Sequence, residues 1–171
     1  MALGDRVPDV INITSQLEKY AELGYVFMIA HRFESIADNS SVELIFVNPS
    51  NSGKKAYIVS IELIAGGETL IDCYKNSTIN ANGTEITPIN KKFGSNIESA
   101  MHVEYGGTYT PSGSSMSFLI TGGASHFTRM GGENEGLIAG IIEPGNNLHI
   151  KLTNKSGTTI KMGIRMVWYE V

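Results

Sequence analysis

The segment Asn147–Val171, NLHIKLTNKSGTTIKMGIRMVWYEV, decides the fold class of this protein. Apolar residues recur at every second position along both of its halves, at Leu148, Ile150, Leu152, Ile160, Met162, Ile164, Met166 and Trp168. A period of two places these side chains on one face of a β-strand. Asn154–Gly157, between the halves, has the composition of a turn. The segment therefore predicts a β-hairpin with one face in the core, Trp168 included, and a wetter opposite face.

Similar strand signals recur between Gly24 and this hairpin. Short runs rich in β-branched and aromatic residues, bounded by Gly, Pro and Asn, predict strands over 41–48, 56–64, 69–76, 115–123 and 136–145. Within 56–64, the alternation predicts one shared face for four residues, Tyr57, Val59, Ile61 and Leu63. About eight to ten strands without intervening helices argue against a parallel βαβ sheet. The predicted fold is all-β, an antiparallel β-sandwich that is jelly-roll-like.

The beginning of the chain carries different signals. Residues 1–13 alternate loosely and contain Pro8, which predicts an extended N-terminal arm. Ser15 and Glu18 have the spacing of a capping box and Gly24 can end a helix, so one short helix is predicted from Ser15 to Leu23. We therefore expect an arm and a short helix over residues 1–24, followed by a β-sandwich domain over residues 25–171.

Composition excludes several classes of function. The chain of 171 residues is long enough for one domain whose core needs no disulfide or metal. Charged residues make up 18%, below the usual ~25%, which fits a surface that neighbouring molecules partly cover. A net charge of −4 does not indicate the basic surface that binds nucleic acid or an anionic membrane. Since neither a signal peptide nor a membrane span is recognisable, we expect the cytosol or, for a virus, assembly in a host cytosol.

The residue types that bind metals do not form a recognisable site. There are four histidines, and no two of them have His-x-His spacing: His31, His102, His126 and His149. Only His102 and Glu104 form a local pair on one strand face, whereas zinc sites need three or four convergent ligands. Pro144 and His149 have a separation close to that of the second cupin motif, but the glycine is one place off. We therefore predict no metal site.

Motifs for nucleophilic or acid–base catalysis are weak as well. Glu133 and Glu135 lie in a Gly-rich loop, where nothing holds two carboxylates at a fixed separation. The sequence has neither a G-x-S-x-G nucleophile elbow nor a phosphate-binding loop. Cys73, the single cysteine, has apolar neighbours and is expected in the core. These patterns predict a protein that is not an enzyme and that binds no cofactor.

Several segments resemble small β-rich virion proteins of tailed bacteriophages. These segments are HRFESIADNSSVELIFVNPS (31–50), KKAYIVSIEL (54–63), DCYKNSTI (72–79), NANGTEITPIN (80–90), KKFGSN (91–96), EPGNNLHIKLTNKSG (143–157) and VWYEV (167–171). The shared motifs near the end are a Pro-Gly that opens a strand, an Asn-x-Ser-Gly hairpin and an aromatic last strand. The resemblance covers roughly residues 25–171 and leaves out the arm and the helix.

The resemblance implies a jelly-roll-like capsid decoration (cement) protein on the exterior of a virion. Such a protein binds the outer surface of a phage capsid and bridges neighbouring major capsid protein subunits. It also implies a homo-oligomer, a trimer or a dimer, that binds neither nucleic acid nor membrane. The turn-rich stretch 79–95 suits contact with a partner surface, and four arm residues are the candidate capsid contacts, Arg6, Val7, Val10 and Ile11.

Other functions remain open. A tail-fibre head or receptor-binding domain of the same fold would bind a sugar or receptor among Tyr105, Tyr109 and the loop 122–136. A free carbohydrate-binding module would use an aromatic groove, to which Phe127 could also contribute. A degenerate cupin enzyme would hold a metal ion, which the missing His-x-His spacing argues against.

Overall fold

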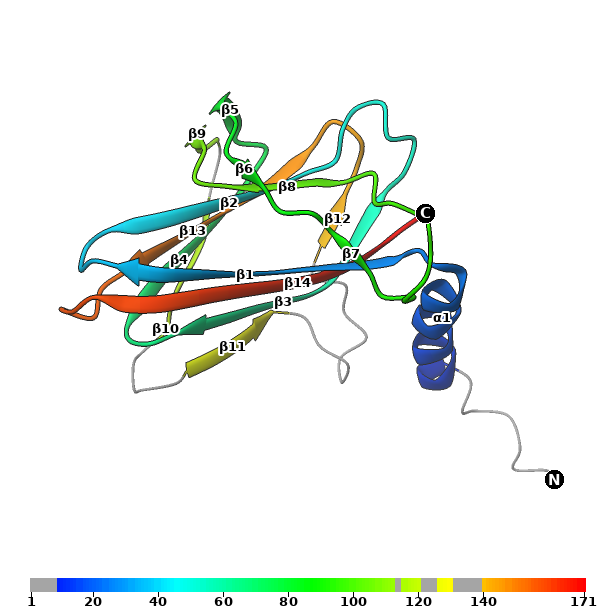
Figure 1. The fold of residues 1–171 in the computed structure, drawn as a ribbon, viewed down its shortest axis with the longest axis horizontal. Helices are drawn as coiled ribbons and strands as arrows, with labels where there is room; N and C mark the ends of the chain where they lie inside the picture. Colours follow the sequence, from blue (N-terminus) through cyan, green and yellow to red (C-terminus); the bar gives the residue numbers. More distant parts are fainter. Residues whose placement is uncertain (1–8, 113–114, 121–125, 131–139) are drawn as a thin grey trace.

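The computed structural model describes residues 9–112, 115–120, 126–130 and 140–171. One helix, α1 (Asp9–Leu23), lies at one end of a body of antiparallel strands (Figure 1). The strands are β1 (Val26–Ile36), β2 (Ser41–Val47), β3 (Ala56–Ala65), β4 (Thr69–Lys75), β5 (Thr78–Ala81), β6 (Thr84–Glu85), β7 (Ile89–Asn90), β8 (His102–Tyr105), β9 (Thr108–Thr110), β10 (Ser115–Ile120), β11 (His126–Met130), β12 (Gly140–Ile142), β13 (Asn147–Asn154) and β14 (Ile160–Glu170).

The strands form a jelly-roll sandwich. One sheet has the order β11-β3-β14-β1-β7, and the facing sheet has the order β10-β4-β13-β2-β8-β6. Successive strands repeatedly cross from one sheet to the other, among them β1 and β2, β3 and β4, β10 and β11, and β13 and β14. This alternation, with antiparallel neighbours throughout the two sheets, is the two-sheet arrangement of a jelly roll. The predicted fold class is confirmed.

The core lies between the two sheets. The predicted alternation of the last two strands is confirmed, because one side of them is buried, at Ile150, Leu152, Ile160, Met162, Ile164, Met166 and Trp168. Trp168 is fully buried, with its ring centroid 5.0 Å from that of Phe46 and 6.2 Å from that of Phe27. These rings come from both sheets, so Trp168 joins the two halves of the sandwich.

A β-bulge changes the buried face of β3. The register with β14 shifts between Val167, which is opposite Ser60, and Trp168, which is opposite Ile58, so Val59 has no residue opposite it in β14. The residues of β3 that belong to the core therefore change parity along the strand, at Ala56, Ile58, Ile61, Leu63 and Ala65. The predicted common face of Tyr57, Val59, Ile61 and Leu63 is wrong, because one extra residue on the bulged strand reverses the alternation.

The helix begins earlier than the sequence pattern predicted. It starts at Asp9, so Val10 and Ile11 lie in its first turn and not in an extended arm. β-branched residues have weak helix propensity, which is why the pattern favoured an extended conformation.

The two signals predicted for the ends of the helix have different outcomes. Ser15 lies inside the helix, so its spacing to Glu18 does not mark the N-terminus. Gly24 follows the last residue with φ of 80°, and its N–H donates to the Ala21 carbonyl at 3.0 Å, as expected of a glycine that ends a helix. Arg6 and Val7 lie outside the described residues.

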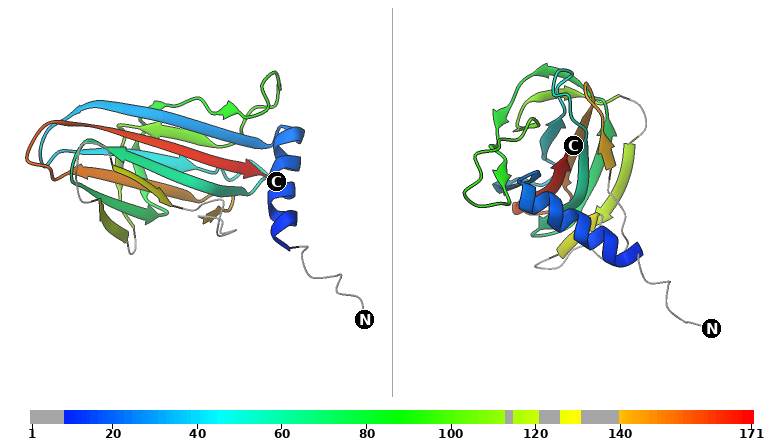
Figure 2. Two further views of the ribbon diagram at one scale, coloured as in Figure 1. Left: turned by 90° about the horizontal axis from the view of Figure 1, so that it is seen from below. Right: turned by 90° about the vertical axis from the view of Figure 1, so that its right-hand side faces the viewer.

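Stacked tyrosines attach the C-terminal part of α1 to the sandwich. The Tyr20 ring stacks on Tyr169 of β14 with centroids 4.8 Å apart, and Tyr169 stacks on Tyr57 of β3 at 4.7 Å. All three side chains are half-buried. Figure 2 shows the helix standing across the end of the sandwich where the chain terminates, and its N-terminal end points away from the strands.

Candidate functional site

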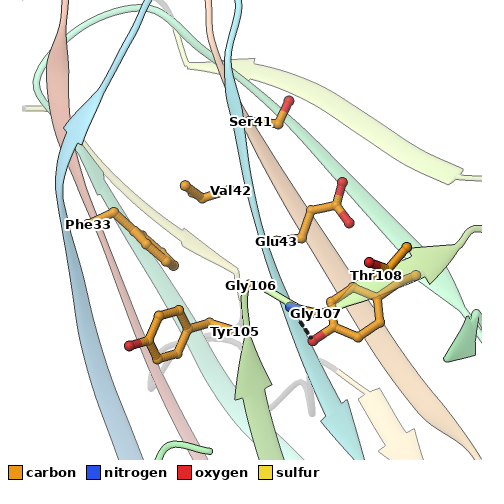
Figure 3. A pocket seen from close by; sticks show the side chains of 9 residues that line it. Phe33, Ser41, Val42, Glu43, Tyr105, Gly106, Gly107 and Thr108 are labelled. Atoms are coloured by element: carbon orange, nitrogen blue, oxygen red, sulfur yellow. Dashed lines mark hydrogen bonds between the residues drawn. The ribbon is translucent and has the colours of Figure 1, made fainter. Parts of the chain in front are cut away.

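A cleft opens on the flank of the sandwich where the edges of the two sheets meet. It has a volume of about 550 Å³ and is lined by Phe33, Ser41, Val42, Glu43, Tyr105, Gly106, Gly107, Thr108 and Tyr109 (Figure 3). β1 pairs with β7 only at Phe27 and Met28, and Phe33, further along β1, lines the cleft. The strands β1, β2, β8 and β9 each contribute a side chain to the lining.

Aromatic rings form one wall of the cleft. Phe33 and Tyr105 meet edge to face with centroids 6.0 Å apart, and His31 lies behind them, 4.0 Å from the Tyr105 ring. Phe33 is buried, whereas Tyr105 is half-buried. Burial lowers the pKa of His31, so the imidazole beside the wall is neutral at neutral pH. The wall is therefore apolar and has a fixed geometry.

The opposite side of the cleft is polar. Glu43 is partly exposed, and its Oε1 lies 3.5 Å from Lys151 Nζ. Tyr109 is held in place by Gly107, whose N–H donates to the phenol oxygen at 3.2 Å, as Figure 3 shows. A Cβ at Gly107 would clash with this phenol group and with the carbonyl oxygen of Ala81, so the close approach requires glycine.

A buried histidine lies beneath Glu43. His149 is fully buried, and its Nδ1 lies 3.1 Å from Ser77 Oγ. Its Nε2 lies 3.3 Å from Glu43 Oε2 but makes no hydrogen bond of acceptable geometry. Ser, His and Glu side chains in a row resemble a nucleophile arrangement, yet Ser77 is only 4% exposed. A serine without access to substrate cannot act as a nucleophile, so this row has no nucleophile that a substrate could reach.

His149 predicts a pH dependence of folding. Burial lowers its pKa below the ordinary value of 6.5, with the Glu43 carboxylate opposing the shift. Lys151, Tyr74 and Tyr109 are its other titratable neighbours. The unfolded chain therefore binds the proton more readily than the folded one, and the stabilisation is complete above pH 6.5 and is lost as the pH falls towards the folded pKa.

We expect the urea midpoint of the wild-type protein to fall between about pH 7.5 and about pH 5. His149→Gln should flatten this part of the dependence, because the buried titrating group is gone. His102→Gln, at an exposed position, is the matched loss of a histidine. A slope that persists unchanged in His149→Gln would assign the pH dependence to other groups.

A second candidate surface lies at the helix end of the sandwich. It consists of four exposed apolar residues, which we call the helix-end face: Leu23, Ile89, Phe93 and Ile97. Asn90 connects the residue after α1 with the segment around Ile97, because its Nδ2 group donates to the carbonyl oxygens of Gly24 at 2.8 Å and Ile97 at 2.9 Å. Phe93 is 89% exposed at the tip of a turn closed by the hydrogen bond from Ser95 N–H to Lys92 carbonyl at 3.0 Å.

The structure separates the residues that the sequence singled out for sugar binding. It brings Tyr105 and Tyr109 to one cleft, as predicted for a binding groove, and it places Trp168 in the core. The 122–136 loop lies mostly outside the described residues, and so do Glu133 and Glu135. Sequence reasoning missed Phe33 and Glu43, since neither lies in a local motif and only the fold brings them beside the tyrosines.

The other predicted residues have ordinary surroundings. His102 is exposed and lies 3.4 Å from Glu85, while Glu104 accepts a hydrogen bond from Gly83 N–H at 2.9 Å. Within the described part of the chain, no group of three or more His, Cys, Asp or Glu side chains could hold a metal ion. No described helix is both long and apolar enough to span a membrane. Cys73 is buried as predicted, and burial raises the pKa of its thiol to about 11.

Comparison with known proteins gives no family. No protein-family model matches the chain, and no curated protein matches it. Among solved structures, it is similar to a de novo designed double-stranded β-helix at 18% identity, with 80% of this chain and 96% of that chain covered and a TM-score of 0.26. The VLP of the giant freshwater prawn Macrobrachium rosenbergii extra small virus has 13% identity, 81% and 79% coverage and a TM-score of 0.16. Neither likeness is close enough to bear on function.

Proposed function

We propose that this protein is a structural component of a phage virion that binds the outer surface of the capsid. In this role it bridges neighbouring major capsid protein subunits, as a dimer or a trimer. The sequence resemblance to small phage virion proteins motivates the proposal. The observation that supports it most is the helix-end face, where Phe93 is 89% exposed.

The helix-end face has the properties of a protein contact. Large exposed aromatic side chains are uncommon on monomeric proteins unless a partner covers them, and aromatic anchors contribute most of the free energy of many interfaces. The Phe93 turn is held before binding by the Asn90 side chain and by the hydrogen bond from Lys91 N–H to Val26 carbonyl at 2.9 Å. A preorganised anchor loses little conformational entropy when it docks.

The segment around Phe93 and the low charge content of the protein also fit a role in binding a capsid surface. The stretch 79–95, which contains Phe93, connects the two sheets through β6 and β7 and then reaches the end of α1. Val10 and Ile11 belong to α1 and remain candidate capsid contacts. With few charges on the protein, burial of this surface costs little desolvation free energy.

Phe93→Ser is expected to weaken binding to capsids that lack this protein by roughly 30-fold, since an aromatic anchor contributes ~2 kcal/mol. Co-sedimentation of the purified protein with those capsids measures the affinity. Ile64→Ser is the matched control, because it removes an exposed apolar side chain near the C-terminal end of β3, outside the helix-end face. This variant should bind as the wild type does.

Cryo-EM of the virion that encodes the chain tests the place of the protein. Density on the outer shell at local symmetry axes, with Phe93 against the major capsid protein, is the expected result. Density at the tail tip alone would replace the proposal with receptor binding. Equal affinity of Phe93→Ser and wild type would reject the helix-end face as the contact.

A further inference from the structure

We infer that the flank cleft is a binding site for a neutral carbohydrate, in addition to the capsid contact proposed above. The cleft is separate from the helix-end face: its lining comes from Phe33, the start of β2 and the segment 105–109. Its volume of about 550 Å³ lies within the range of small-molecule sites, which combine apolar walls with a few fixed polar groups.

The aromatic wall provides the apolar part of the site. Phe33 and Tyr105 meet edge to face with ring centroids 6.0 Å apart, and the buried Tyr109 also lines the cleft. A sugar ring has an apolar face of C–H groups, which packs against aromatic rings and removes apolar surface from water. Aromatic side chains of this kind therefore suit a ring-shaped ligand.

The polar groups on the other side are suited to hydroxyl groups. The Glu43 carboxylate offers acceptor oxygens, and the Thr108 side chain lies exposed at the rim. Glu43 lies 3.5 Å from Lys151 Nζ and 3.3 Å from Nε2 of the buried His149. Hydrogen bonds to an ionised carboxylate are stronger than those between neutral groups, so a donor hydroxyl is the natural partner of Glu43.

The charge balance selects a neutral ligand. Lys151 already lies 3.5 Å from Glu43, and the neighbouring His149 is neutral because of its burial, so a cation would compete with a lysine that is in place. An anion would meet the carboxylate of Glu43. A purely apolar ligand would remove Glu43 from water without replacing its hydrogen bonds, which is unfavourable.

Hydrogen bonds within the protein hold the turns beside the cleft in place without a ligand. Glu104 holds the backbone N–H of Gly83, and Gly107 holds the phenol of Tyr109, so both turns beside the cleft are fixed by hydrogen bonds. Gly106, with φ of 71°, makes the bend between Tyr105 and Thr108 possible. A site formed in this way binds without reorganising its walls.

The test is an NMR titration of the full, 15N-labelled chain with methyl glycosides of glucose, galactose, mannose and N-acetylglucosamine. We expect saturable shifts at residues lining the cleft for at least one glycoside at concentrations of tens of millimolar. Tetramethylammonium chloride is the cationic probe. Shifts with tetramethylammonium alone, or none at the cleft with any of the four glycosides, would overturn the inference.

Two variants assign the binding to the cleft. Glu43→Gln keeps the size of the side chain but removes its charge, and it should raise the Kd of the bound glycoside about tenfold or more, equivalent to ~1.4 kcal/mol. Glu143→Gln is the matched control, because Glu143 also pairs with a lysine, Lys55 at 2.9 Å, and lies outside the cleft. Thr108→Val, at an exposed position, should weaken binding without affecting the fold. Equal Kd values in Glu43→Gln and Glu143→Gln would exclude the carboxylate as a ligand group.

This test is independent of the capsid proposal. Phe93→Ser should bind the glycoside as the wild type does, and Glu43→Gln should bind capsids as the wild type does. Loss of both activities in one folded variant would mean that the two sites are not separate and would overturn the inference as stated.

Discussion

Trp168→Ala is expected to lower the free energy of unfolding by about 3–5 kcal/mol, the usual cost of removing a large buried aromatic side chain. Trp168 is fully buried between Phe27 of one sheet and Phe46 of the other. The substitution leaves a cavity that the two sheets cannot close without moving, and it also removes the indole donor of the hydrogen bond to Glu170 at 3.0 Å.

Urea denaturation followed by far-UV circular dichroism measures this effect, and Trp168→Phe should recover part of the loss. Phe93→Ala is the control, because the Phe93 side chain is 89% exposed and its removal should change stability by less than ~0.5 kcal/mol. A loss below ~1 kcal/mol for Trp168→Ala would contradict the placement of this ring at the centre of the core.

Glu170→Ala is expected to cost about 3 kcal/mol or more, although the residue is the next to last of the chain. Glu170 is 1% exposed, and its carboxylate accepts hydrogen bonds from Ser99 Oγ and from Trp168 Nε1 through Oε1. Its Oε2 accepts the N–H of Ala100 at 3.0 Å and lies 3.4 Å from Lys54 Nζ. Alanine leaves the buried indole N–H of Trp168 and the partly buried donors of Ser99 and Ala100 without this acceptor, and an unsatisfied buried group costs ~1–3 kcal/mol.

The Glu170 network also fixes the segment 99–101 to the end of β14. We therefore expect faster amide hydrogen exchange at Ala100 and Met101 in Glu170→Ala, beyond the global change in stability. Glu143→Ala removes an exposed carboxylate that pairs with a lysine and should have little effect. Combining Glu170→Ala with Trp168→Ala should cost less than the sum, because one hydrogen bond is lost in both. Strict additivity would contradict this coupling.

The cleft and the helix-end face differ in how far the sequence could point to them. Tyr105 and Tyr109 are close in the sequence and could be predicted to line one groove. Glu43 and Phe33 could not be linked to them, because antiparallel pairing of β2 with β8 and the opening at the edge of β1 bring these residues together. Phe93 lies in a turn whose exposure depends on its hydrogen bonds to Asn90 and to residues after α1.

The sequence by itself determined the all-β class, the bounds of most long strands and the buried face of the last hairpin. These features are local: alternation with a period of two and turn residues act over a few positions. The tertiary structure alone decided the start of α1, the change of face at the β3 bulge and the composition of both candidate sites. The β3 bulge and the two candidate sites depend on the register between strands that are far apart in the sequence, and register is set by packing across the sandwich, which no local pattern encodes.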